Sequence, residues 1–181
     1  MAHKSEFQGD GPVGFIGAGR LGSSLAIAMD RAGYEIIAIH RRSPSKARLS
    51  LSSLAGSNVT DRPQQVVEAA KIIFITTPDD VIYDTVNHLD WGPNQAVIHC
   101  SGAMPVSLLR KARDQRAAVG GMHPIQTFPT EDSHDSFKGV TFGLESENPK
   151  LIDWMQLLSG NLGGRHIELL ADRKSTRLNS S

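Results

Sequence analysis

Short runs of hydrophobic residues alternate along the chain with longer segments in which hydrophobic and polar positions recur at helical spacing. The short runs are typical of buried strands, because neither face of such a strand meets water. They predict strands at residues 13–16, 35–40, 58–60, 71–76, 96–100, 117–120, 139–144 and 166–169.

The amphipathic segments between these runs predict helices at residues 21–32, 44–55, 63–70, from 78 onward, 106–116 and 149–158. In the first of them Leu21, Leu25 and Met29 fall on one face, and Gly33 follows as a typical C-cap glycine. Strands and helices alternate with short connections. This order predicts an α/β fold, a doubly wound, mostly parallel sheet with helices on both faces.

Composition and charge exclude several classes of partner. The 19 Lys and Arg residues balance the 19 Asp and Glu residues, so no excess of positive charge indicates nucleic acid. No hydrophobic run approaches the ~20 residues needed to cross a bilayer. Cys100 is the only cysteine, which excludes an internal disulfide. We expect a cytoplasmic protein that binds neither nucleic acid nor a membrane.

Both ends of the chain are expected to lie outside the folded domain. Residues 1–11 are polar, lack the apolar core of a signal peptide, and are interpreted as a disordered leader. Residues 172–181 match the translation of a common sequencing adapter, so this tail is interpreted as an artefact. A genuine polar, disordered terminus is the alternative. The domain is then expected to span residues 12–171.

Residues 17–22 read Gly-Ala-Gly-Arg-Leu-Gly, the pattern G-x-G-x-x-G, between the first predicted strand and the first predicted helix. Gly17 permits the tight turn, Gly19 lets a pyrophosphate approach the backbone, and Gly22 lets helix and strand pack closely. The N–H groups at the helix start then face the phosphates. The motif predicts a dinucleotide-binding (Rossmann) domain in which Gly17, Gly19, Arg20, Leu21 and Gly22 contact the cofactor. A purely structural turn is the alternative.

The end of the second predicted strand indicates which dinucleotide is bound. An NAD site holds the ribose hydroxyls with an Asp or Glu about 20 residues after the glycines. That count arrives at His40, and Arg41, Arg42 and Ser43 follow. Two guanidinium groups and a hydroxyl suit the 2′-phosphate of NADP. We therefore predict NADP(H) as the cofactor, bound through Arg41, Arg42 and Ser43, with a solvated basic loop as the alternative.

Three further segments are expected at the carboxyl edge of the sheet, where ligands of open α/β sheets bind. Thr77 and Pro78 are expected to cap and begin a helix while their backbone contacts the cofactor. Ser101 follows a strand and presents a hydroxyl to nicotinamide or substrate, unless it only forms a Ser-Gly turn. His123 precedes Pro124 and is placed to move a proton, unless it only hydrogen-bonds a loop.

Metal chemistry and thiol chemistry are not expected. The other histidines show no clustering, and no metal-ligand spacing stands out. Cys100 has no partner implied by the sequence, so we interpret it as a small buried residue rather than a nucleophile.

Taken together, the motifs resemble those of pyrroline-5-carboxylate reductase-like proteins and of the related NADP (deazaflavin-dependent) oxidoreductases. The nearest resemblance is to uncharacterised bacterial proteins in which a helical domain of unknown function follows the Rossmann-like domain. The resemblance runs from about residue 12 to about residue 170, and its motifs are residues 14–22, 77–80, 99–103 and 122–128.

This resemblance implies hydride transfer between NADP(H) and a small carbonyl, imine or hydroxy substrate. It also implies a C-terminal helical domain that dimerises and closes the active site, and nothing after residue 171 would supply it. The chain alone is therefore expected to be inactive, and to form a homodimer only with that domain.

Prephenate dehydrogenases resemble the chain more distantly. They place a serine after a middle strand and a His-Pro pair after the next strand, which implies Ser101 and His123 as a catalytic pair. They also have a glycine soon after the His-Pro pair, where this chain reads Ile125 to Phe128, and their carboxylate-binding arginines have no match. Two other functions remain open: a non-catalytic NADP-binding sensor, and a deazaflavin-linked NADP reductase.

Overall fold

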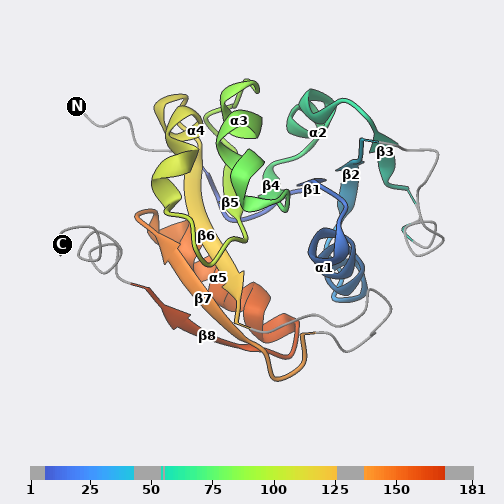
Figure 1. Ribbon diagram of the computed structural model, residues 1–181. Helices are drawn as coiled ribbons and strands as arrows, with labels where there is room; N and C mark the ends of the chain where they lie inside the picture. The colour runs from blue at the N-terminus through green and yellow to red at the C-terminus, as the bar shows by residue number, and fades with distance from the viewer. Residues whose placement is uncertain (1–6, 43–53, 55, 126–136, 170–181) are drawn as a thin grey trace.

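A computed structural model describes residues 7–42, 54, 56–125 and 137–169 of the chain. Within these residues, strands occur at β1 (Val13–Ile16), β2 (Ile36–His40), β3 (Asn58–Thr60), β4 (Ile72–Ile75), β5 (Ala96–His99), β6 (Ala118–Pro124), β7 (Thr141–Ser146) and β8 (Arg165–Glu168). They form one sheet in the order β3-β2-β1-β4-β5-β6-β7-β8 (Figure 1). Neighbouring strands pair in parallel, except that β6 and β7 are antiparallel.

Helices cover both faces of this sheet (Figure 1). On one face lie α1 (Arg20–Arg31) and α5 (Pro149–Asn161), and on the other lie α2 (Pro63–Ala69), α3 (Ile82–Asn87) and α4 (Arg110–Asp114). Short 3₁₀ turns at Asp79–Val81 and Val106–Leu109 lead into α3 and α4. The predicted doubly wound, mostly parallel α/β fold is confirmed. In the part of the chain that the structure describes, no helix has the length and apolar character to cross a membrane.

The predicted elements are present with small shifts, and β6 differs most. The sequence predicted a strand over 117–120, whereas β6 runs for seven residues to Pro124. The reason is β7, which pairs antiparallel with Gly120 to Pro124 and extends the strand beyond the end of β5. Such a distant partner leaves no local sequence signal. His123 therefore lies within a strand and not after one. The helix predicted over 44–55 lies largely outside the described residues.

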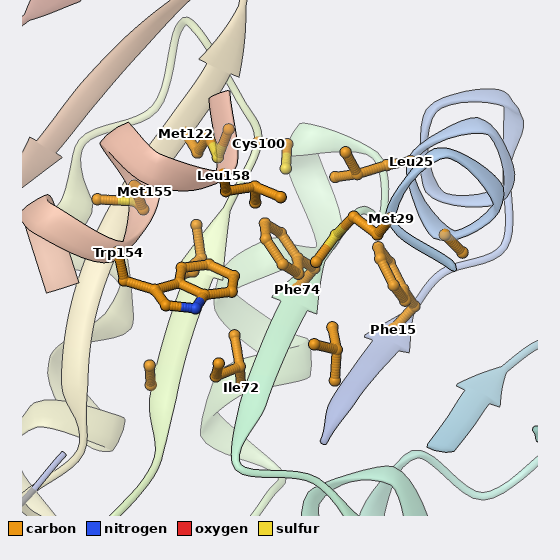
Figure 2. Close-up of a cluster of buried hydrophobic side chains, with 14 of the residues drawn as sticks. Phe15, Leu25, Met29, Ile72, Phe74, Cys100, Met122, Trp154, Met155 and Leu158 are labelled. Carbon is orange, nitrogen blue, oxygen red and sulfur yellow. The ribbon is translucent and has the colours of Figure 1, made fainter. Parts of the chain in front are cut away.

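The larger hydrophobic core lies between the sheet and the helices α1 and α5. Phe15 of β1 and Phe74 of β4 stack with their ring centroids 5.2 Å apart. Met29 of α1 and Trp154 of α5 pack around this pair (Figure 2), and the Trp154 ring centroid lies 6.1 Å from that of Phe74. Large aromatic side chains bury the most apolar area per residue. They hold α1 against the two strands whose ends carry the candidate site.

One residue of the segment expected to be a disordered leader, residues 1–11, is buried in the core. Phe7 is 1% exposed and belongs to the core beside α1 and α5. Next to it, the Lys150 ammonium of α5 donates a hydrogen bond of 2.8 Å to Gln8 Oε1. The segment is polar apart from this one aromatic side chain, and burial of the ring anchors the segment to the domain.

Candidate functional site

The candidate site follows the carboxyl edge of the sheet. Because β1, β2, β4 and β5 pair in parallel, their carboxyl ends share that edge. The chain leaves β1 towards β2 on one side, and returns to β4 on the other side. Such a reversal of strand order opens the crevice where ligands of open α/β sheets bind. The structure brings the segments after β2, β1, β4 and β5 together there, in that spatial order.

The glycine turn, residues 17–22, joins β1 to α1 and depends on two of its glycines. Gly17 has a φ of +104°, which strongly favours glycine, and a Cβ there would lie 2.8 Å from the Thr77 nitrogen. A Cβ on Gly22 would overlap the carbonyl oxygen of Gly17. That oxygen also accepts a hydrogen bond of 2.5 Å from Thr76 Oγ1. The turn is therefore packed directly onto the end of β4.

The start of α1 presents unpaired backbone donors. Gly19 is the N-cap, and the first helical hydrogen bond runs from the Ser23 N–H to the Gly19 carbonyl at 2.9 Å. The N–H groups of Arg20, Leu21 and Gly22 precede that bond and point out of the helix end. No side chain of the described residues caps this end, and its first turn holds no acidic residue. A Cβ on Gly19 would meet no atom of the described residues within 4 Å. Open space and a positive helix end suit a phosphate.

The end of β2 lies beside the glycine turn. The Gly17 N–H donates to the His40 carbonyl at 3.3 Å, and the Arg41 N–H donates to the Thr60 carbonyl at 2.8 Å. Arg41 is half-buried, and its Nη1 is buried with no hydrogen-bond partner in the described part of the chain. Arg42 is exposed. A buried guanidinium nitrogen without a partner is costly, and a bound phosphate would satisfy it. Ser43 lies outside the described residues.

At the end of β4, the expected helix cap is absent. The helical turn begins only at Asp79, with Pro78 in the N-cap position and no side-chain cap. The extended backbone of Pro78, with ψ of 150°, places Thr77 one residue too early to cap it. Thr77 Oγ1 is buried and has no partner among the residues described. The backbone nitrogen of the same residue lies 2.8 Å from the Cβ position of Gly17, so Thr77 adjoins the glycine turn.

A hollow of about 480 Å³ adjoins this edge on the side of α2 and α3. Its volume is in the range of small-molecule sites, about 300–1,000 Å³. Local sequence could not predict this hollow, because only the sheet order brings the end of β3 and the helix α3 beside β2. The lining residues are Ile16, His40, Asp61, Arg62, Pro63, Gln64, Asp84, Thr85, His88 and Leu89.

His123 lies at the far end of the edge, where β6 extends beyond β5. Its Nδ1 is 3.1 Å from the Cys100 carbonyl oxygen. A carbonyl can only accept, so Nδ1 carries the proton and Nε2 of the neutral ring is left as an acceptor. A Cβ on Gly102 would lie 2.6 Å from Cδ2 and 2.7 Å from Cε1 of His123. The ring therefore rests against the backbone of Gly102, a position where any side chain would displace it.

Ser101 forms a local turn. Its Oγ accepts hydrogen bonds from the Ala103 N–H at 3.2 Å and the Met104 N–H at 3.1 Å. The structure records no hydrogen bond between Ser101 and His123 within the described residues. The carbonyl of Cys100, and not the serine hydroxyl, orients the histidine. The Ser101 hydroxyl hydrogen remains able to donate to a ligand.

Thiol chemistry and metal binding were the other two kinds of chemistry considered for this chain. Cys100 is 5% exposed, and burial raises the pKa of its thiol to about 12. A thiol that stays protonated is a poor nucleophile, which agrees with its interpretation as a small core residue. Among residues 7–42, 54, 56–125 and 137–169, no cluster of three or more His, Cys, Asp or Glu side chains could hold a metal ion.

Comparison with known proteins identifies a family. The family model described as NADP oxidoreductase, coenzyme F420-dependent, matches residues 12–102. This segment contains the glycine turn, the ends of β2 and β4, and Ser101. No protein of curated function matches the sequence.

Solved structures share the fold. A Bacteroides fragilis protein assigned as an NADP oxidoreductase is 23% identical, with a TM-score of 0.74, over 94% of this chain and 65% of its own. Prephenate dehydrogenase from A. aeolicus, solved with hydroxyphenyl propionate and NAD+, is 15% identical, with a TM-score of 0.71, over 89% and 60%. Pyrroline carboxylate reductase from Plasmodium falciparum, solved with NADP, is 15% identical, with a TM-score of 0.67, over 93% and 60%. The chain thus spans 60% to 65% of the length of these structures.

Proposed function

The chain belongs to the family of NADP oxidoreductases described as coenzyme F420-dependent, and we propose that it is the cofactor-binding domain of an oxidoreductase. That enzyme transfers a hydride between NADP(H) and a small carbonyl, imine or hydroxy substrate. One observation carries the proposal: an open helix N-terminus at the glycine turn lies beside Arg41, whose Nη1 is buried and has no partner among the residues that the structure describes. Each of the two features suits one anionic group. NADP has two such groups, its pyrophosphate and its 2′-phosphate.

The pyrophosphate binds at the start of α1. Gly17 and Gly22 hold the turn, Gly19 leaves space, and the N–H groups of Arg20, Leu21 and Gly22 donate to the phosphate oxygens. The exposed Arg20 side chain adds positive charge near this point. These contacts do not distinguish NADPH from NADH.

The 2′-phosphate binds at the end of β2. Arg41, with its unpaired Nη1, holds it as a charge-assisted pair, and Arg42 and Ser43 complete the site. The nicotinamide end lies towards β4 and β5, with Thr77, Pro78 and Ser101 as its contacts. The Thr77 hydroxyl, which has no partner in the described part of the chain, supports this direction.

When bound, the nicotinamide supplies the hydride chemistry, and the protein positions it and moves the proton. His123 is the proton carrier, through Nε2. Because Nδ1 donates to the Cys100 carbonyl in both protonation states of the ring, the histidine gains or loses its Nε2 proton without losing its orientation. Ser101 assists at the substrate oxygen or at the nicotinamide amide.

The complete protein acts on a small molecule in the cytoplasm. The chain spans 60% to 65% of the neighbours' length, and we propose that a further unit, helical as the family resemblance implies, completes the substrate site and forms a homodimer. A deazaflavin-linked NADP reductase is the second candidate, favoured by the family description. Reduction of coenzyme F420 by NADPH, without any carbonyl or imine, would establish it. A protein that binds NADPH and transfers no hydride to any acceptor would be a sensor.

Cofactor preference is tested by replacing the two arginines. Arg41→Ala with Arg42→Ala is expected to weaken NADPH binding by about tenfold to a hundredfold, the loss of one charge-assisted pair of about 1.5–3 kcal/mol, because Arg41 makes the main contact and the exposed Arg42 adds little. NADH binding should change by less than about threefold, since NADH lacks the 2′-phosphate. The measurement is a titration with each cofactor, followed by fluorescence or calorimetry.

The control for this pair is Arg31→Ala, an exposed arginine at the opposite end of α1. It removes a positive charge far from the edge of the sheet and should leave both affinities unchanged. Equal losses of NADPH and NADH affinity in the double variant would contradict the assignment of the 2′-phosphate to these arginines.

A further inference from the structure

His40 occupies the place in the fold where an NAD-binding domain carries an acidic residue. It ends β2 and pairs with Ile16 of β1 on one side and Thr60 of β3 on the other. Its carbonyl accepts the hydrogen bond from the Gly17 N–H at 3.3 Å. The backbone of His40 thus touches the first residue of the glycine turn. In this fold a dinucleotide bound at that turn places its adenosine ribose near the end of the second strand.

The side chain of His40 lines the hollow and has an unsatisfied nitrogen. Nδ1 is buried and finds no hydrogen-bond partner among the described residues. His88, which lines the same hollow from α3, has its Nδ1 2.6 Å from the Asp84 carbonyl oxygen. Of these two histidines, only His40 has a ring nitrogen that is buried without a partner.

The charges around His40 are mixed. Burial lowers the pKa of its ring, the Asp61 carboxylate opposes that shift, and Arg42 adds to it. The hollow also holds Arg62 from the start of α2, and Asp84 and His88 from α3, while Arg41 follows His40 in the chain. Without a ligand the ring is therefore mainly neutral at pH 7. A doubly negative phosphate beside it would favour the imidazolium.

We propose that His40 reads the 2′ position of the ribose and makes the preference for NADPH over NADH depend on pH. The inference rests on the proposed function, because it needs the dinucleotide at the glycine turn. As imidazolium, His40 donates a charge-assisted hydrogen bond to the 2′-phosphate of NADPH. As neutral imidazole, it hydrogen-bonds the 2′-hydroxyl of NADH. Binding of NADPH therefore takes up a proton, and binding of NADH does not.

The 2′-phosphate itself also titrates, with a second pKa of about 6. As pH falls, protonation of the phosphate weakens its pairing with Arg41 and Arg42. Protonation of His40 acts in the opposite direction and strengthens the complex. The two effects are separated by His40→Gln, whose amide can hydrogen-bond either cofactor but carries no charge at any pH.

The first experiment measures the ratio of NADH to NADPH dissociation constants at about pH 6 and about pH 8, on either side of the ordinary histidine range. At the lower pH, wild type should exceed His40→Gln in this ratio by about tenfold, the effect of one charge-assisted hydrogen bond. At the higher pH, the two should agree within about twofold. His88→Gln is the matched control from the same hollow and should keep the pH dependence of wild type.

A second measurement needs no variant. Calorimetric titration of the wild-type chain in two buffers of different ionisation enthalpy reports the protons taken up on binding. At about pH 7.5, where the 2′-phosphate is already mostly dianionic, NADPH should show net uptake and NADH none. His40→Gln should abolish the uptake.

Two results would overturn the role of His40 and leave NADP binding intact. One is a ratio of dissociation constants that differs between wild type and His40→Gln by the same factor at both pH values. The other is a release of protons when NADPH binds. If folded wild type binds neither cofactor at about pH 8, the proposed function fails, and the role of His40 fails with it.

Discussion

Gly22→Ala is expected to abolish NADPH binding and to destabilise the domain by about 1–3 kcal/mol, the usual cost of forcing an extra carbon into a packed site. The new Cβ would overlap the Gly17 carbonyl oxygen and lie 2.5 Å from Thr76 Oγ1. These two atoms are themselves joined by a hydrogen bond of 2.5 Å. Neither can withdraw without opening the glycine turn. Thermal unfolding and an NADPH titration of the same sample would measure both effects.

Substitutions at two other glycines distinguish an effect on folding from an effect on cofactor binding. Gly160 in α5 has no atom of the described residues within 4 Å of its Cβ position. Gly160→Ala should therefore bind NADPH normally and gain up to about 1 kcal/mol of helix propensity. Gly19 is equally open, so Gly19→Ala should fold as well as wild type to within about 1 kcal/mol. Its methyl group would nevertheless occupy the space left for the pyrophosphate. Unchanged NADPH affinity in Gly19→Ala would show that no phosphate approaches this backbone.

The glycine turn shows why part of the site could be predicted from sequence. The positive φ of Gly17 and the close approach of Gly22 to the Gly17 carbonyl oxygen both arise within one strand-turn-helix unit. Local sequence contains that information, whereas the contact of the turn with Thr76 and Thr77 comes from a distant strand. The same holds for the strands at β1, β4 and β5, whose continuous hydrophobic runs reflect burial on both faces.

The features that the sequence missed depend on long-range neighbours. His123 lies in a strand because β7 returns antiparallel along β6, and Phe7 is ordered because the core accepts its ring. The hollow beside His40 exists because β3 and α3 come to the same edge. Thr77 was expected to cap a helix, and the backbone of Pro78 delays that helix by one residue. The first three outcomes are decided by packing between segments far apart in the chain, and the last by the backbone conformation of a single proline.

His123→Ala is expected to lower turnover of the complete protein by about 10²–10⁴-fold, the usual contribution of a positioned general acid or base. NADPH affinity should stay within about twofold, because a residue that acts on the substrate proton adds little to cofactor binding. Turnover is followed as the loss of NADPH absorbance with carbonyl and imine acceptors. Ser101→Ala should cause a smaller loss, since its Oγ is already engaged by two backbone N–H groups.

Gly102→Ala tests whether position, and not merely the presence of an imidazole, matters at His123. The added methyl would collide with the ring, which is held from the other side by the Cys100 carbonyl at 3.1 Å. The histidine must then turn away, so turnover should fall although the imidazole is retained and NADPH still binds. Diethyl pyrocarbonate, which acylates free imidazole nitrogens, should modify His123 at a different rate in this variant.

Normal turnover in His123→Ala would remove the histidine from the mechanism. Normal turnover in Gly102→Ala alone would mean that the ring works from an orientation other than the one held by Cys100.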